Sequence, residues 1–278
     1  VGLIHSSVPG SPVEAWTPLE VLRGRPELQP VLEAASAESR TRDHPAVLYN
    51  GMIAPVVPYE LRGAIWYQGE RNALKKLARF YDTQLELMIE AWRDDWDKPF
   101  PFYSVQLPNW RTNRPGWVPI RDAVFQVYRR VPRTGFAVTI DIGEPGNIHP
   151  DNKQDVGLRL ALWALGETYG KALVYSGPLF ESAERRGRSM VISFEHEDGG
   201  LVARDGELSG FEMAGPDRRF VPARARIEGE KVVVTSPEVE EPAAVRYAWK
   251  PNPDASLYNE AGLPTSPFRT DDWPLFDE

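Results

Sequence analysis

The sequence contains no cysteine among its 278 residues, so disulfide bonds, thiolate metal sites and a cysteine nucleophile are all excluded. This absence does not fix the cellular compartment, because many exported proteins also lack cysteine. Long apolar runs are missing as well, and no stretch approaches the ~18 consecutive apolar residues that a membrane-spanning helix needs. We therefore expect no membrane span.

Positive charge is scarce and is not gathered into a basic run. Lys and Arg total 32 against 40 Asp and Glu, which gives a formal net charge of −8. Such a chain repels phosphate backbones, so we expect no nucleic-acid partner. Disorder of most of the chain is excluded, because nine Trp, ten Tyr and eleven Phe supply too much apolar surface to leave in water.

The sequence patterns of metal and nucleotide sites are also missing. There is no His-Glu-x-x-His pair, no EF-hand loop, no Gly-x-Gly-x-x-Gly segment and no Walker loop. We therefore expect neither a metal ion nor a cofactor.

Apolar patterning in the first part of the chain predicts strands and helices in alternation. The length suits one large domain or two smaller ones. Strands are predicted at Val1–His5, Ala64–Tyr67, Phe102–Leu107 and Phe136–Ile140. Helices are predicted from Pro12 with Ser11 as N-cap, over about 73–94, over Pro119–Arg130 and over Asn152–Tyr169. This order is typical of an α/β fold whose parallel sheet carries helices on both faces and the active site at the C-terminal ends of its strands.

The pattern changes near residue 172. Short apolar runs separated by Gly-Gly and Asp-Gly turns predict an antiparallel β-sandwich over 173–250. The stretch 251–278 is rich in proline and is predicted to be an irregular tail, packed on the body through Tyr258, Phe268 and Trp273. The predicted organisation is therefore an α/β domain over 1–172, a β-sandwich over 173–250 and a tail over 251–278.

Among the four histidines, His149 is the strongest candidate for proton transfer. It follows a predicted buried strand in a Gly/Pro loop that also holds Asp141, Glu144 and Asp151. A carboxylate that orients an imidazole makes the imidazole a competent general base. His5, beside two serines, is the rival candidate, whereas a structural role is expected for His196 and a solvated position for His44.

Two further loops follow predicted strands and carry polar groups. Gln68 and Asn72 can donate side-chain hydrogen bonds to a developing oxyanion, and Gly69 between them allows close backbone approach. The alternative is a capped helix start. The loop with Ser6 and Ser7 suggests a nucleophile, and the alternative is that both hydroxyls bond backbone groups in a turn.

These segments together resemble the sialate O-acetylesterase family of SGNH-type hydrolases. The matching pieces include Val1-Gly2-Leu3-Ile4-His5-Ser6-Ser7, Trp66-Tyr67-Gln68-Gly69-Glu70, Ile140-Asp141-Ile142-Gly143, Ile148-His149-Pro150 and Val245-Arg246-Tyr247-Ala248-Trp249. The resemblance extends over essentially the whole chain, and the Trp-Tyr-Gln-Gly-Glu and Ile-His-Pro pieces are specific in combination.

The resemblance implies a flavodoxin-like, three-layer SGNH hydrolase domain and a serine esterase mechanism. A serine would attack an acetyl carbonyl, His149 would take its proton, and water would hydrolyse the acyl-enzyme. Gly10, through its backbone N–H, and Gln68, through its side chain, would bind the oxyanion, with Asn72 as the alternative donor. Asp141 is the favoured orienting acid, while Glu144, a backbone carbonyl or a Ser–His dyad remains open.

The sequence departs from the family pattern at three places. The Gly-Gln-Ser-Asn-Met turn of the family nucleophile is absent, so we expect that turn and its strand upstream of Val1, in a longer protein, a separate chain or a cleaved precursor. Pro9 stands where the family usually has glycine, which removes one N–H and leaves the oxyanion role of this loop to Gly10. Gly146 stands where related esterases have the Asp of Asp-x-x-His.

The expected function is hydrolysis of acetyl esters on sialic acid or on polysaccharide sugars. Trp110 and Trp117 are candidates for stacking on a sugar ring, with a core position as the alternative. The alternative function is a non-catalytic carbohydrate-binding relative, or the C-terminal part of a divided protein. Family members that act on polysaccharides are often exported to the periplasm or the extracellular space, but nothing in these residues fixes the compartment.

Overall fold

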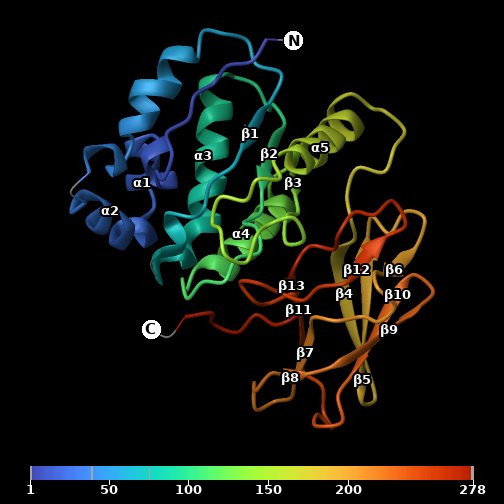
Figure 1. Cartoon of the computed structure of the whole chain (residues 1–278). Helices are drawn as coiled ribbons and strands as arrows, with labels where there is room; N and C mark the ends of the chain where they lie inside the picture. The colour runs from blue at the N-terminus through green and yellow to red at the C-terminus, as the bar shows by residue number, and fades with distance from the viewer. Residues whose placement is uncertain (1, 39, 75, 277–278) are drawn as a thin grey trace. The chain divides into compact units, whose positions relative to one another are not determined.

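The computed structural model describes residues 2–38, 40–74 and 76–276 (Figure 1). The chain divides into two compact units. The first comprises the residues up to Leu107 together with Arg114–Phe136, and the second comprises Pro108–Asn113 together with the residues from Ala137 onward. Each unit is described by itself below.

A three-stranded sheet forms the centre of the first unit, in the order β1 (Ala64–Trp66), β2 (Phe102–Val105), β3 (Thr134–Ala137). β1 and β2 are parallel, with Trp66 beside Ser104. Every residue of β2 is buried, as expected of a central strand with both faces covered. The α/β fold predicted from the sequence is confirmed.

Helices α3 (Tyr81–Asp95) and α4 (Trp117–Arg130) accompany this sheet and pack against each other. The predicted apolar face of α3 is buried along its length, at Tyr81, Leu85, Met88 and Trp92. Trp117 is fully buried at the start of α4, so it is a core residue and does not offer its ring to a sugar.

The N-terminal part of the first unit is built from short helices. The α-helices are α1 (Leu19–Arg23) and α2 (Gln29–Ser36), and the 3-10 and π turns lie at Val13–Trp16, Pro26–Leu28, Thr41–Asp43, Tyr49–Ile53, Ala54–Val56, Asn72–Leu74 and Lys76–Phe80. The predicted helix from Pro12 is therefore only a 3-10 turn. Ser11 does not cap it, because its hydroxyl donates to the Val8 carbonyl and accepts from the Trp16 indole.

The strand predicted at Val1–His5 is wrong for the described residues Gly2–His5, which are not in a strand. Leu3 is 93% exposed and Ile4 is 50% exposed. An apolar run forms a strand only where a neighbouring strand accepts its backbone hydrogen bonds, and none of the described strands pairs with this segment. β1 lies at the edge of its sheet, and its Ile65 is 71% exposed.

The second unit contains α5 (Gln154–Trp163), which continues as a π turn over Ala164–Thr168, and two four-stranded antiparallel sheets. One sheet has the order β4 (Leu179–Arg186), β5 (Ser189–Glu195), β10 (Lys231–Thr235), β9 (Arg224–Glu228). The other has the order β13 (Phe268–Arg269), β11 (Ala244–Tyr247), β7 (Phe211–Ala214), β8 (Val221–Pro222), and a third pair joins β12 (Leu257–Asn259) to β6 (Leu201–Ala203).

Aromatic side chains from the two four-stranded sheets meet between them. Phe268 stacks on Phe180 at 5.0 Å between ring centroids and lies edge-on to Phe194 at 5.8 Å, which packs the sheets face to face as a sandwich. The tail predicted to be irregular contributes β13 to one of these sheets and β12 to the separate pair with β6.

The compact units are divided at a different place from the predicted boundary at 172/173, because the segment from Ala137 through α5 groups with the β region. Trp163 of α5 lies 5.0 Å from the Tyr175 ring and 5.8 Å from the His196 ring. Aromatic contacts of this kind join α5 to the chain that follows it.

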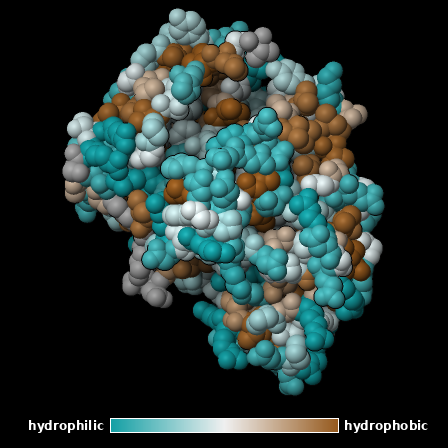
Figure 2. All heavy atoms as spheres, in the orientation of Figure 1, coloured by the Kyte–Doolittle hydropathy of each residue, from teal (hydrophilic) through white to brown (hydrophobic). Residues whose placement is uncertain are grey.

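Exposed apolar residues occur in α5 and in the π turn that continues it. Leu158 of α5 is 55% exposed and Leu165 of the π turn is 38% exposed. Figure 2 shows apolar surface exposed on the face of the molecule that it draws. Within the described ranges, no helix is both long enough and apolar enough to cross a membrane.

Candidate functional site

The turn after β1 contains a glycine, Gly69, that packs closely against the core. Gly69 has a φ of +148°, and a Cβ at this position would lie 2.8 Å from Ile120 and 3.2 Å from Leu107. Only glycine allows the chain to pass this close to the core in this conformation. Trp66, at the end of β1, anchors the turn through edge-on contacts with Trp16 and Trp92 at 5.9 and 6.0 Å.

Gln68 is buried within this turn, and its amide is fully used. Its Nε2 donates to the Ser11 carbonyl at 3.0 Å and to Asn72 Oδ1 at 2.7 Å, and its Oε1 accepts from the Tyr81 hydroxyl at 2.9 Å. Burial raises the pKa of the Tyr81 hydroxyl, which keeps that group protonated as a donor. Gln68 therefore has no amide hydrogen left for an oxyanion.

Asn72, in contrast, keeps one amide hydrogen. Its Oδ1 accepts from the Val13 backbone N–H at 3.0 Å and from Gln68, and its Nδ2 donates to Glu14 Oε2 at 2.9 Å. A side-chain amide carries two N–H donors, and no described residue accepts the second one. Asn72 is half-buried, and its three hydrogen bonds fix the direction in which this second N–H points.

Gly10 lies beside this group in the loop that leads to Ser11. It is exposed and has a φ of +67°, and no other described residue accepts a hydrogen bond from its N–H. The structure thus brings together Gln68, Asn72 and the loop of Gly10, through the bond from Gln68 to the Ser11 carbonyl.

The rival histidine contacts a serine. Ser7 Oγ lies 2.6 Å from His5 Nε2, and both residues are exposed. Ser6 donates to the Met52 carbonyl at 3.0 Å, which is the backbone-bonding alternative for this loop.

The solvated position expected for His44 is wrong. His44 is half-buried, and its Nε2 lies 2.8 Å from the Glu38 carbonyl oxygen.

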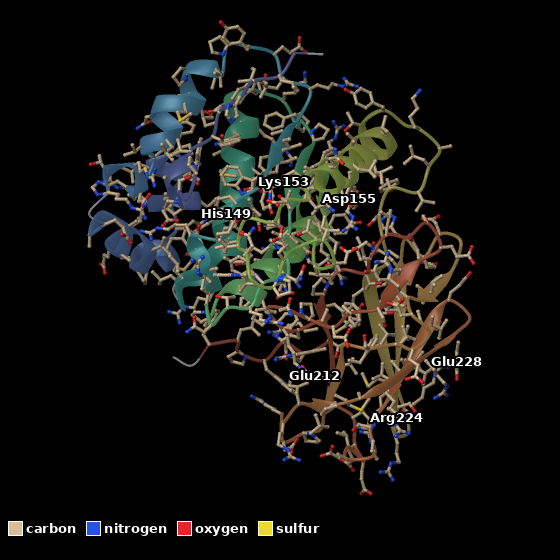
Figure 3. All side chains as sticks on the ribbon, viewed as in Figure 1. His149, Lys153, Asp155, Glu212, Arg224 and Glu228 are labelled. Atoms are coloured by element: carbon tan, nitrogen blue, oxygen red, sulfur yellow. The ribbon has the colours of Figure 1, made fainter. Side chains whose placement is uncertain are left out.

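His149 lies in the second unit, in the segment between β3 and α5, where Figure 3 labels it with Lys153 and Asp155. Its backbone N–H donates to Asn147 Oδ1 at 2.9 Å, and no hydrogen bond joins its imidazole to any described residue. The side chain is exposed. Both ring nitrogens are therefore open to a reaction partner.

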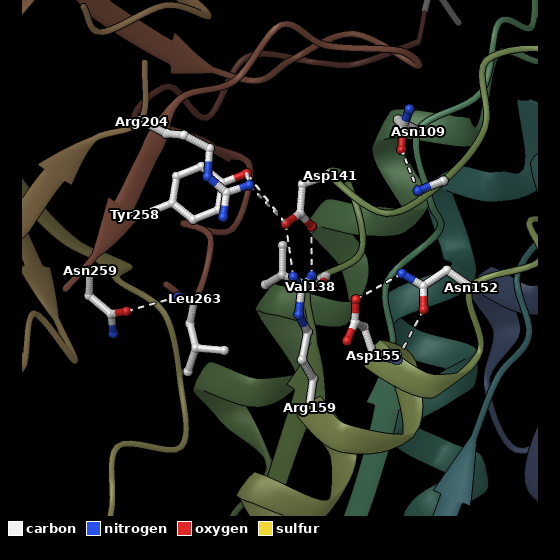
Figure 4. Close-up of polar contacts among 11 residues, drawn as sticks. Asn109, Val138, Asp141, Asn152, Asp155, Arg159, Arg204, Tyr258, Asn259 and Leu263 are labelled. Atoms are coloured by element: carbon white, nitrogen blue, oxygen red, sulfur yellow. Dashed lines mark hydrogen bonds and ion pairs between the residues drawn. The ribbon is translucent and has the colours of Figure 1, made fainter. Parts of the chain in front are cut away.

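Two carboxylates near His149 in sequence, those of Glu144 and Asp141, are engaged elsewhere. Glu144 accepts from the Asp151 backbone N–H at 2.8 Å and from Asn147 Nδ2 at 3.3 Å, so it closes the loop on itself. Asp141 forms a two-point ion pair with Arg159 of α5, at 2.6 and 2.8 Å, and accepts from the Tyr258 hydroxyl at 3.3 Å (Figure 4). The structure does not bring Asp141 into hydrogen-bond contact with His149.

Several residues of these sites were not predicted. Glu14 and Tyr81, which orient the two amides, lie 58 residues from Asn72 and 13 residues from Gln68. Arg159 and Tyr258 lie 18 and 117 residues from Asp141. The spacing of Tyr81 on an apolar helix face predicted its burial but not its hydroxyl bond. In the described ranges, no group of three or more acidic or histidine side chains has the arrangement of a metal site.

Comparisons with known proteins confirm the resemblance found in the sequence. A family profile described as carbohydrate esterase, sialic acid-specific acetylesterase matches residues 1–166. The chain is 29% identical to the sialate O-acetylesterase of Pongo abelii and 27% identical to that of Homo sapiens, over 96% of this chain and 57% of each relative.

A solved structure is also similar. A carbohydrate acetylesterase from Xanthomonas citri superposes with a TM-score of 0.86 at 42% identity, over 95% of this chain and 59% of the other. The chain thus spans somewhat more than half the length of the relatives it matches.

Proposed function

Because this chain belongs to the sialic acid-specific acetylesterase family of carbohydrate esterases, we propose that it acts in the hydrolysis of O-acetyl esters on a sugar. The substrate would be an acetylated sialic acid or an acetylated polysaccharide sugar. The observation that carries this proposal is the Asn72 amide, which three neighbours hold in place and which keeps one hydrogen for a ligand.

The Asn72 amide and the Gly10 N–H are the proposed oxyanion donors. Attack on an acetyl ester moves negative charge onto the carbonyl oxygen, and preorganised donors stabilise that charge. Gln68 takes a supporting role, because both of its hydrogens hold the Ser11 carbonyl and Asn72. These two bonds support a role for Gln68 in positioning Asn72.

His149 is the proposed general base. A serine hydroxyl gives its proton to the imidazole as its oxygen attacks the ester carbon, and the protonated imidazole returns that proton to the sugar oxygen that leaves. Water then repeats the sequence on the acyl-enzyme and releases acetate. We assign a Ser–His dyad, since the carboxylates of Asp141 and Glu144 are bound to other groups.

The serine is proposed to come from a segment that adds to the free edge of β1. The Ala64 N–H donates to the Pro101 carbonyl on the β2 side, so by the alternation of a strand the Ile65 N–H faces away from β2. The exposed Ile65 side chain and this outward N–H suit a further strand. The relatives, which are longer than this chain, have residues enough to supply one.

Hydrogen exchange at Ile65 tests this strand. In the product of the intact natural gene, the Ile65 amide should exchange as slowly as the buried amides of β2. Exchange at the rate of an exposed amide would remove the proposed segment from this edge.

Labelling with a serine-reactive fluorophosphonate tests the proposed function. The intact mass of the natural gene product should increase by one adduct, and the labelled protein should no longer release acetate from an acetylated sugar. The adduct should be on a serine other than Ser6 and Ser7. An adduct on Ser7 would instead favour the pair that it forms with His5. No adduct and no acetate release would favour the alternative, a non-catalytic carbohydrate-binding protein.

A further inference from the structure

We propose that Tyr258 and Asn252, both from the C-terminal β region, are positioning residues for the segment that carries His149. The inference rests on the proposed role of His149 as general base. Its basis is that two separate hydrogen-bonded chains run from the C-terminal region to residues 141–145, a few positions before the imidazole.

The first chain ends on Asp141. Arg159 holds both carboxylate oxygens, and the Tyr258 hydroxyl donates to one of them while accepting from Arg204 at 2.9 Å (Figure 4). Arg204 also lies over the Tyr258 ring at 3.7 Å from its centroid. The Asp141 and Arg159 side chains are only 8% and 11% exposed, so water screens this ion pair weakly. Arg159 further donates to the Val138 carbonyl, which fixes the start of the segment.

The second chain ends on Gly143. Asn252 accepts from Asn109 Nδ2 at 3.0 Å, and Asn109 Oδ1 in turn accepts from the Gly143 backbone N–H at 2.7 Å. A Cβ on Gly143 would lie 2.5 Å from oxygen atoms of Asn109, so any side chain at this position would clash with Asn109. Arg111 N–H donates to the Pro145 carbonyl at 3.0 Å and holds the next turn.

These contacts determine where the His149 imidazole lies, because the ring has no partner of its own among the described residues. A side chain without such a partner is positioned by the backbone that carries it. A misplacement of about 1 Å can cost a rate factor on the order of 10². The β region therefore serves the reaction by fixing residues 138–145, in addition to any contact that it makes with a sugar chain.

The test compares Tyr258→Phe, Asn252→Ala and the double variant in the natural gene product. Tyr258→Phe keeps the ring under Arg204 and removes only the hydroxyl. Tyr59→Phe is the matched control, since the Tyr59 side chain is 65% exposed and its hydroxyl bonds no described residue. Readouts are kcat and KM for acetate release, well below the melting temperature, and hydrogen exchange of the peptide over 138–150.

Each single variant should lower kcat about 3- to 10-fold with KM unchanged, and should speed exchange over 138–150 by a similar factor. The double variant should exceed either, and Tyr59→Phe should match the wild type. Variants that melt earlier but keep kcat and the exchange of 138–150 would show a merely structural role and overturn the proposal.

The exchange readout separates this inference from the proposed function. If the wild type releases no acetate, the proposed function fails, yet faster exchange confined to 138–150 would still show that Tyr258 and Asn252 hold the segment. Unchanged exchange in both variants would overturn the positioning role, whatever the activity.

Discussion

The Nε2 of Gln68 donates to the Oδ1 of Asn72 across 2.7 Å, so one amide positions the other. The consequence is a division of roles between two residues that look alike in sequence. Gln68 uses its hydrogens within the protein, whereas Asn72, held at its oxygen, keeps one hydrogen that no described residue accepts and that is the proposed donor to the substrate. Experiments on the two residues should therefore give different results.

Replacing Asn72 by alanine should lower kcat by about 10²- to 10³-fold with little change in KM, because an oxyanion donor acts on the transition state. Steady-state hydrolysis of an acetylated sugar by the natural gene product measures this. Asn113→Ala, at an exposed asparagine whose side chain forms no hydrogen bond with a described residue, is the control and should match the wild type. A variant at position 72 with normal kcat would exclude it as a donor.

Replacing Gln68 by alanine should lower the free energy of unfolding by about 1–3 kcal/mol, because buried partners such as the Tyr81 hydroxyl lose their bonds. Denaturant unfolding measures the loss. The fall in kcat should be smaller than for Asn72→Ala. A stable variant with the larger catalytic loss of the two would instead make Gln68 the direct donor.

Replacing Gly69 by alanine should destabilise the protein by about 1–3 kcal/mol, since the new Cβ would press on Ile120 in a backbone conformation that favours glycine. Gly157→Ala is the matched control. Gly157 lies within α5 with open space around it, so alanine should stabilise the protein by about 0.5–1 kcal/mol. Because Gly69→Ala should destabilise the protein and Gly157→Ala should stabilise it, the same change in stability for both variants would contradict this explanation.

Alkaline pH should cancel the contribution of the Tyr258 hydroxyl to the free energy of unfolding. Burial and the Asp141 carboxylate raise the pKa of Tyr258 to about 12 from its ordinary value of 10.0. A pKa raised in the folded state means that the stabilisation is fully present below pH 10 and is lost as the pH rises through about 12.

The difference in unfolding free energy between the wild type and Tyr258→Phe measures this contribution. It should be constant from neutral pH to about 10 and then shrink. A difference that grows with pH would show that the hydroxyl is ionised more easily in the folded protein, against the contacts described.

The periodic elements were predictable because side-chain spacing alone determines them. Leu85 and Met88 lie on one face of α3 and are buried, as the pattern predicted. The position of β4 could not be predicted within the β region, because β4 is an edge strand whose exposed residues are polar and its sequence has no apolar run. The segment around Leu3 was misassigned for the opposite reason, since its apolar run has no strand to pair with in the described chain.

Candidate residues for the site could be proposed from the sequence, but their hydrogen-bond partners could not. Asp141 was favoured as a partner of His149 because the two are close in sequence, whereas its carboxylate pairs with Arg159 and Tyr258. Those partners come from α5 and β12. The sequence around a carboxylate does not indicate which side chain from another element will bind it. The same holds for Glu14 and Asn72.

His149 is the proposed carrier of the proton in ester hydrolysis. Acetate release from an acetylated sugar by the natural gene product should be compared with that of its His149→Gln and His5→Gln variants. We expect kcat to fall at least about 10³-fold for His149→Gln and to stay normal for His5→Gln. A wild-type rate for His149→Gln would exclude His149 as the general base.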